Sequence, residues 1–269
     1  MLNHSIFVSM KTRRIKCSRV QQEASVFFQK TVQNAYSLFH ICNPTPNHIF
    51  SSLSKNALIY DFTSANVIVR SMFEAYINMY FLLLDKISDE ERNFRLDRWE
   101  KHALTERKII VEALGSKHSI LETDAEEINK FETKIYESKY FNKLSENEQT
   151  SIRKSKKWTK LNALEKADLA GIDRSQAEYL YKILSNYTHS ESYAIMQLHS
   201  IEEPLEAKEL CNLSMIFGEM FLSLSLAGFA SVNQDVLELA YQNEQVVELI
   251  KFWNQLKSKK LNELSQQRI

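Results

Sequence analysis

Glycine and proline are scarce in this sequence, with four and three residues respectively among 269. Turn-rich β folds and doubly wound α/β folds need both residue types at hairpins, bulges and phosphate-binding loops. Long helices that are joined by few breaks need little of either. The scarcity therefore predicts an all-α fold, a multi-helix bundle.

Cysteine is also scarce, and its pattern excludes two kinds of site. Cys17, Cys42 and Cys211 are odd in number and widely spaced, which fits neither a disulfide framework nor a zinc-binding pattern. The sequence also has no dinucleotide-binding glycine motif, Walker loop or nucleophile elbow. We therefore expect free thiols in a reducing cytoplasm, and neither a metal nor a cofactor.

An excess of charge of either sign is missing, because 34 lysines and arginines balance 34 acidic residues. Proteins dedicated to duplex DNA usually carry a basic excess, since their affinity comes from neutralising phosphates. A local basic run from Arg153 to Lys160, with Trp158 inside it, is the exception. Such runs are usually solvated surface, and contact with nucleic acid is the alternative interpretation.

Capping signals and breaks along the chain predict about nine helices in a single domain over residues 1–269. Ser88 with Glu91, for example, has the spacing of a capping box, and Gly115 and Gly171 have the positions of C-terminal caps. The expected helices are 5–40, 52–86, 88–114, 123–138, 145–155, 162–170, 174–189, 203–230 and 233–265. The core is expected in residues 20–115 and 160–265. Residues 116–157 are polar and are expected to form a helical-hairpin insertion, or alternatively to complete the same bundle.

Two stretches are apolar enough to resemble membrane spans. Residues 67–84 contain Arg70 and Glu74, and residues 213–230 contain Glu219. Because a central arginine is costly in lipid, we interpret both as buried core helices and expect no membrane insertion. The second also carries a stripe at helical spacing, mostly of small residues, which predicts close contact with another helix: Ser214, Gly218, Phe221, Ser225 and Gly228.

A pair of charged residues in the first apolar helix needs a partner inside the fold. Arg70 and Glu74 are four residues apart and hence lie on one face of the helix. A second polar stripe occurs in the helix of residues 174–189 and consists of Glu178, Lys182, Ser185 and His189. Since burying either stripe alone is costly, we expect the two helices to pack along these stripes, with Arg70 and His189 in one shared site.

The chemistry of this constellation allows two interpretations. A histidine that ends a polar stripe beside an apolar face suits a general acid or base, and Ser185 precedes His189 by one helical turn, like a nucleophile and its base. The alternative is a structural Arg–Glu–His network that fixes how the helices pack.

The ordered segments Arg70-Ser-Met-Phe-Glu74, Lys157-Trp-Thr159 and Tyr179-Leu-Tyr-Lys-Ile-Leu-Ser-Asn-Tyr-Thr-His-Ser190 resemble the bacterial domain-of-unknown-function family 5677. The resemblance covers about residues 55–200. It implies no established activity.

The chain is more distantly similar to HEPN-type helical ribonucleases, which pair an arginine with a later histidine on one helix and cleave RNA as homodimers without metal. The matching pair here is Lys182 and His189, so a lysine replaces the arginine. The similarity implies a ribonuclease or toxin-type effector in phage defence. His189 would be the acid or base, Arg70 and Lys182 would hold the phosphate, and Glu74 would orient Arg70. The alternative is a non-catalytic interaction or scaffold module.

Overall fold

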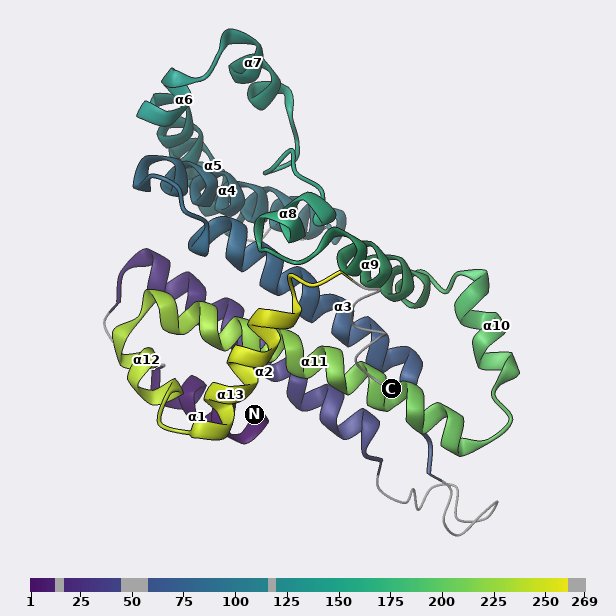
Figure 1. Ribbon diagram of the computed structural model, residues 1–269. Helices are drawn as coiled ribbons and strands as arrows, with labels where there is room; N and C mark the ends of the chain where they lie inside the picture. The colour runs from purple at the N-terminus through teal and green to yellow at the C-terminus, as the bar shows by residue number, and fades with distance from the viewer. Residues whose placement is uncertain (13–16, 45–57, 116–119, 261–269) are drawn as a thin grey trace. The chain divides into compact units, whose positions relative to one another are not determined.

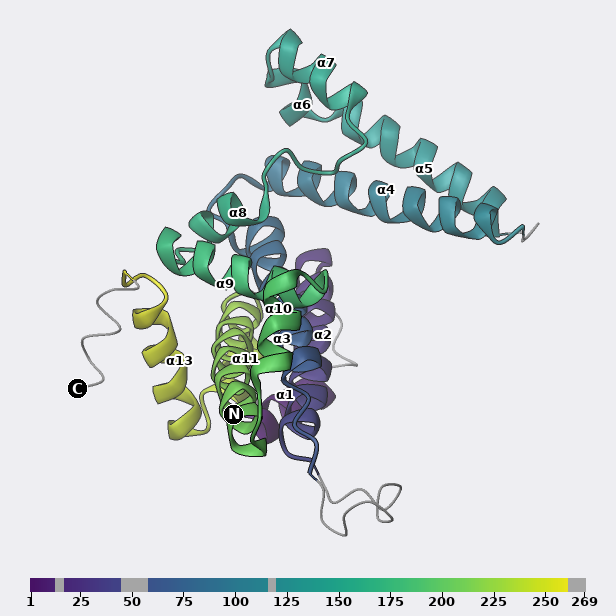
Figure 2. The same ribbon diagram turned by 90° about the vertical axis from the view of Figure 1, so that its right-hand side faces the viewer.

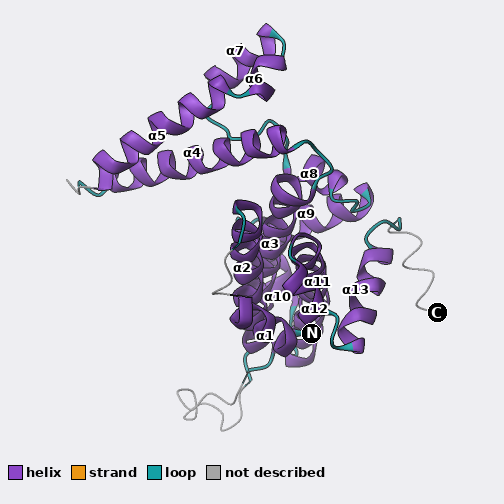
Figure 3. Cartoon of the chain, turned by 90° about the vertical axis from the view of Figure 1, so that its left-hand side faces the viewer, coloured by secondary structure: helices purple, strands orange, loops and turns teal. Residues whose placement is uncertain are grey.

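The computed structural model describes residues 1–12, 17–44, 58–115 and 120–260, and within these ranges the chain is helical without strands (Figure 3). The helices are α1 (Leu2–Thr12), α2 (Arg19–Cys42), α3 (Phe62–Met79), α4 (Asp89–Ala113), α5 (Ile120–Glu137), α6 (Lys139–Lys143), α7 (Glu146–Lys154), α8 (Ala163–Leu169), α9 (Arg174–Thr188), α10 (Ser192–Ser200), α11 (Pro204–Val232), α12 (Gln234–Ala240) and α13 (Glu244–Leu256). A short π-helix, η2 (Tyr80–Leu84), continues α3. The all-α prediction is confirmed, with more helices than the nine expected.

The chain divides into two compact units, and each is described by itself. The first unit contains residues 1–84 and 163–269, and the second contains residues 85–162. Residues 116–157, which were expected to form an insertion, lie in the second unit together with α4. The number of independently folding domains stays a prediction.

The first unit is built around three long helices, α2, α3 and α11, which lie side by side (Figures 1 and 2). Aromatic residues fill the space between them: Phe221 is fully buried, with its ring centroid 5.5 Å from that of Phe73 and 6.4 Å from that of Tyr76. A second contact joins Phe28 to Phe229 at 5.4 Å. The apolar helices of the sequence thus form the core of this unit.

The small-residue stripe of α11 faces these neighbours, as predicted, and its five residues are all buried. A Cβ atom added to Gly218 would overlap with Leu38 Cδ2. A Cβ atom added to Gly228 would lie 2.5 Å from Leu84 Cδ1, which is also too close for two carbon atoms. Both glycines therefore allow a closer approach of helices than any larger residue would permit.

The second unit consists of α4 paired with α5, followed by α6 and α7. Its small core contains Phe94, Ile135 and Phe141. At one end of the helix pair, the buried Asp124 carboxylate accepts two hydrogen bonds from the Arg107 guanidinium. These contacts hold α4 and α5 together.

Several helix boundaries differ from the predicted ones. The helix expected at 5–40 is two helices, because Ser18 and Gln21 form a capping box that begins α2. The helix expected at 52–86 begins at Phe62, although residues 52–57 lie outside the described ranges. The last helix, expected at 233–265, is divided at Asn243, which caps α13, and its end beyond Lys260 lies outside the described residues.

Other capping signals had mixed outcomes. Ser88 caps α4 as predicted, and Gly115 and Gly171 have φ of 66° and 73°, as αL caps do. The short helices α6 and α10 were not predicted. Helix α5 begins before residue 123, so the start predicted there is wrong.

Two cysteines lie next to each other in the first unit, where α2 packs on α11. Cys42 and Cys211 are 2% and 0% exposed, whereas Cys17 is exposed. The hydrogen bond with Cys211, together with burial, raises the pKa of the Cys42 thiol. All three thiols are free, as predicted.

By length and composition, two helical stretches could cross a membrane: Phe62–Leu84 and Pro204–Val232. The most apolar window of each is 56% and 61% buried within the fold, respectively. A core helix can have the same length and apolar composition as a membrane span, so burial within the fold accounts for the composition of these two helices. The cytoplasmic location stays a prediction.

Candidate functional site

Arg70 of α3 joins α3 to α9, and the predicted packing of these two helices is confirmed. Its side chain is only 11% exposed. The Nη1 atom of Arg70 donates to Ser185 Oγ at 3.1 Å and to the backbone carbonyl of Tyr181 at 3.3 Å. The guanidinium also lies over the Tyr181 ring, 3.7 Å from its centroid. Arg70 is thus bound to α9 by hydrogen bonds and by stacking.

Glu74 completes the pair, but its environment differs from the predicted one. Arg70 Nε donates to Glu74 Oε1 at 3.0 Å, and Nη2 lies 2.8 Å from the same oxygen. The Glu74 side chain is 48% exposed, so the expectation that both charges are buried is wrong for Glu74. The glutamate lies on the solvent side of α3, because the apolar side chains of that helix already fill the interface with α2 and α11.

The polar stripe of α9 is divided between two environments. Ser185 faces Arg70, as described, whereas Glu178 pairs with Arg174 at 2.8 Å on the surface. Lys182 and His189 are exposed, and neither side chain forms a hydrogen bond or ion pair with another described residue. The shared site of Arg70 and His189 stays a prediction.

A second cation near Glu74 was not singled out in the sequence. Lys166 of α8 is 9% exposed and donates its ammonium to the Asn78 side chain at 2.5 Å. Burial lowers the pKa of Lys166, and the nearby Glu74 carboxylate opposes that shift. A lysine in the short segment before Gly171 has no distinctive spacing, so its burial was not predictable from pattern alone.

These contacts fit a structural connection between helices better than a phosphate-binding site. Four of the interactions that a guanidinium can donate are already made within the protein. A phosphate would have to displace Ser185 or Glu74 to reach Arg70. Among the described residues, no group of three His, Cys, Asp or Glu side chains is arranged to hold a metal ion.

Helix α10 is the most conspicuous surface feature near this site. Only Ala194 of its nine residues is buried. Large apolar side chains on it are half exposed or more, namely Tyr193 at 50%, Ile195 at 55%, Met196 at 70% and Leu198 at 53%. The Tyr187 hydroxyl of α9 donates to Gln197 Oε1 and so ties α10 to α9, and burial raises the pKa of Tyr187 to about 12.

Comparison with known proteins identifies the family. A family of unknown function, DUF5677, matches residues 45–206, which is more than half of the chain and includes α3, α9 and α10. No curated protein and no solved structure matches the chain. The chain therefore belongs to DUF5677.

Proposed function

We propose that the chain is a helical interaction module that forms a homodimer through α10. The observation that supports this proposal is the exposure of four large apolar side chains on that helix, with exposed fractions of 50–70%. Apolar side chains gathered on one short helix are typical of surfaces that another protein covers. The Arg70 network then has a structural role, in holding α9 and thereby the base of α10.

A second copy of the chain is the partner that fits this surface. A two-fold axis brings the same helix of each copy together, so that Tyr193 and Met196, which lie about 60° apart on one side of α10, can meet their counterparts in the second copy. The net charge of zero means that two copies have no long-range repulsion from net charge. Methionine and tyrosine, which α10 supplies, are also enriched at such interfaces.

Replacing Met196 with glutamate should weaken the dimer. A carboxylate at the centre of an apolar contact loses its hydration without gaining a partner, so we expect the dimer dissociation constant to rise by about tenfold or more. Sedimentation velocity over a range of concentrations measures this constant. The control is Val26→Glu, which adds the same charge at an apolar residue that is 52% exposed on α2.

The control variant should dimerise like the unmodified chain. A chain that is monomeric at every concentration tested, or equal weakening by both variants, would contradict the proposal that α10 is the interface.

A ribonuclease of the HEPN-like type is the second candidate function, with an effector role in phage defence. Its support is the exposure of Lys182 and His189, whose side chains have no partner among the described residues and are open to a ligand. His189 lies three residues before the start of α10. A pairing of α10 in which the starts of the two helices lie together would bring two copies of His189 near each other.

The reaction would follow the usual route of metal-independent RNA cleavage. His189 accepts the proton of a ribose 2′-hydroxyl, whose oxygen forms a bond to the adjacent phosphorus. The bond from phosphorus to the 5′-oxygen breaks, and the partner's His189 donates a proton to that oxygen. Lys182 neutralises the phosphate, while Arg70 positions α9 through Ser185 and Glu74 orients Arg70.

Incubation of the purified protein with total RNA tests this second candidate. His189→Ala should reduce cleavage at least about a hundredfold, since general acid–base catalysis contributes that much. The control His40→Ala removes an exposed histidine from α2. Cleavage that is equal in both variants indicates a contaminating nuclease, and no cleavage by the unmodified chain leaves the interaction module as the function.

A further inference from the structure

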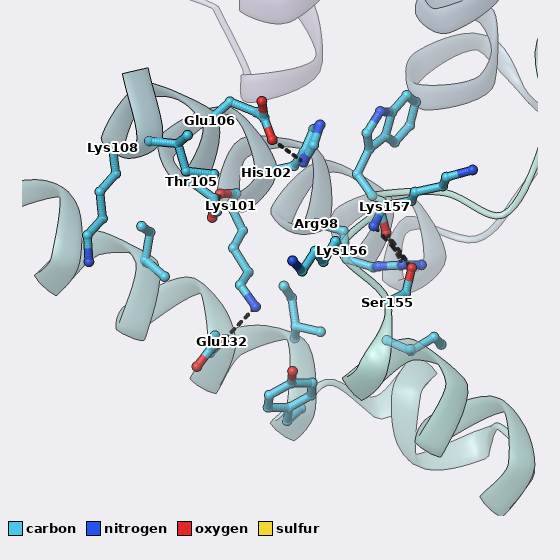
Figure 4. A pocket seen from close by; sticks show the side chains of 16 residues that line it. Arg98, Lys101, His102, Thr105, Glu106, Lys108, Glu132, Ser155, Lys156 and Lys157 are labelled. Carbon is cyan, nitrogen blue, oxygen red and sulfur yellow. Dashed lines mark hydrogen bonds and ion pairs between the residues drawn. The ribbon is translucent and has the colours of Figure 1, made fainter. Parts of the chain in front are cut away.

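The second unit contains a pocket of about 390 Å³ that neither candidate function uses (Figure 4). Side chains of α4 and α5 form two of its walls. Residues 152–158, at the end of α7 and just after it, form the third. All the lining residues belong to the second unit. This volume lies within the range of pockets that hold small molecules.

Positive charge predominates in the pocket. Five of its side chains are lysine or arginine and two are glutamate, and the cations are Arg98, Lys101, Lys108, Lys156 and Lys157. Glu132 pairs with Lys101 at 2.5 Å, Lys108 lies 3.9 Å from Glu112 outside the pocket, and Glu106 lies 4.0 Å from His102. The excess of positive charge is therefore not neutralised by the acids of the pocket.

Three of these cations are available to a ligand. Arg98 donates to the backbone carbonyl of Lys157 at 3.0 Å and pairs with no described carboxylate. Burial lowers the pKa of Arg98, although the guanidinium stays protonated. The ammonium groups of Lys156 and Lys157 have no partner among the described residues. An anion in the pocket would relieve this unfavourable distribution of charge.

The remaining wall of the pocket is apolar and aromatic. Ile109, Ile128, Ile135 and Ile152 contribute alkyl groups, and Tyr136 and Trp158 contribute rings. A site of this kind suits a ligand with a charged end and a flat, weakly polar body, because the body replaces water against the apolar wall. The volume leaves room for about one nucleotide and is too small for a folded macromolecule.

We infer that this pocket binds a nucleoside phosphate. Its phosphate would lie against Arg98 and Lys156, with the charge of Lys157 at the edge of the pocket, and its base would lie against the aromatic and isoleucine side chains. Lys157 and Trp158 also belong to the basic run noted in the sequence, so that run has a binding function. The inference is independent of the interface on α10 and of the chemistry at His189.

Titration of the full chain with fluorescent N-methylanthraniloyl-ADP, at low and at moderate salt, tests this inference. The variant Lys156→Gln/Lys157→Gln should raise the dissociation constant at least about tenfold, because it removes two charges next to the phosphate. The matched control is Lys139→Gln/Lys143→Gln, which removes two charges from exposed side chains of the same unit, outside the pocket. We expect the control to bind like the unmodified chain, and inorganic phosphate to compete weakly.

Three results would overturn the inference. The first is no binding of the nucleotide by the unmodified chain, and the second is equal weakening by both double variants. The third is tight binding of a single-stranded ten-nucleotide RNA that unlabelled ADP fails to displace, since this would assign the basic run to an RNA surface. None of these outcomes depends on the oligomeric state or on RNA cleavage, so the proposed function is tested separately.

Discussion

Replacing Arg70 with alanine should lower the free energy of unfolding by about 2–4 kcal/mol, which is a large part of the stability of a typical domain. The substitution leaves the Tyr181 carbonyl and the Ser185 hydroxyl without their donor, and it removes the stacking contact on the Tyr181 ring. It also leaves Glu74 without its ion-pair partner, at a smaller cost because that side chain is half exposed. Urea unfolding followed by circular dichroism measures the change.

The double variant Arg70→Met/Glu74→Leu separates a structural role from a functional one. Apolar replacement of both members of a partly buried pair is often tolerated, so we expect stability within about 1 kcal/mol of the unmodified chain. Loss of dimerisation or of RNA cleavage in that folded double variant would contradict a purely structural role. A single variant Glu74→Gln should cost less than about 1 kcal/mol.

Replacing Phe221 with alanine should cost still more, about 3–5 kcal/mol of the free energy of unfolding. The ring is fully buried between α11 and α3, in contact with Phe73 and Tyr76. Its removal takes apolar surface out of the core and leaves a cavity that the close packing at Gly218 and Gly228 prevents from collapsing. Urea unfolding again measures the change in free energy, and the transition to compare is that of the first unit, which contains Phe221.

The matched control for this prediction is Phe252→Ala. That phenylalanine is 49% exposed on α13, so its loss should cost less than about 1 kcal/mol. Comparable losses from the two substitutions would show that Phe221 is not at the centre of the core.

The packing of α3 on α9 was predictable because it follows from an energetic requirement. A guanidinium on a buried apolar helix needs hydrogen-bond acceptors. The sequence shows a second polar stripe beside an apolar face on α9, and this stripe can supply them. The stripe of small residues on α11 was predictable because small residues at helical spacing let another helix approach closely. Both predictions depend on what the residues cost when buried, and not on exact helix boundaries.

The exposure of Glu74 could not be predicted in the same way. Its helix is apolar on nearly every face, so the sequence does not indicate which face meets solvent. That choice depends on how α2 and α11 cover α3, which is a property of packing over long distances in the sequence. Lys166 and its contact with Asn78 have the same origin.

Helix α10 was missed for a local reason. The expected helices 174–189 and 203–230 leave residues 190–202 between them, and α10 lies in that interval. Glu203 precedes Pro204 without a side-chain cap, so the proline alone marks the start of α11. No helix was expected in residues 190–202, so the surface that matters most for the proposed function was not identified.

The two buried thiols make the contact between α2 and α11 chemically measurable. An aromatic disulfide reagent reaches Cys17 at once, whereas Cys42 and Cys211 react only when the two helices part, because both sulfur atoms are shielded. The raised pKa of Cys42 slows its reaction further, since the thiolate is the reactive form. The rate of the slow labelling phase thus reports how often the centre of the first unit opens.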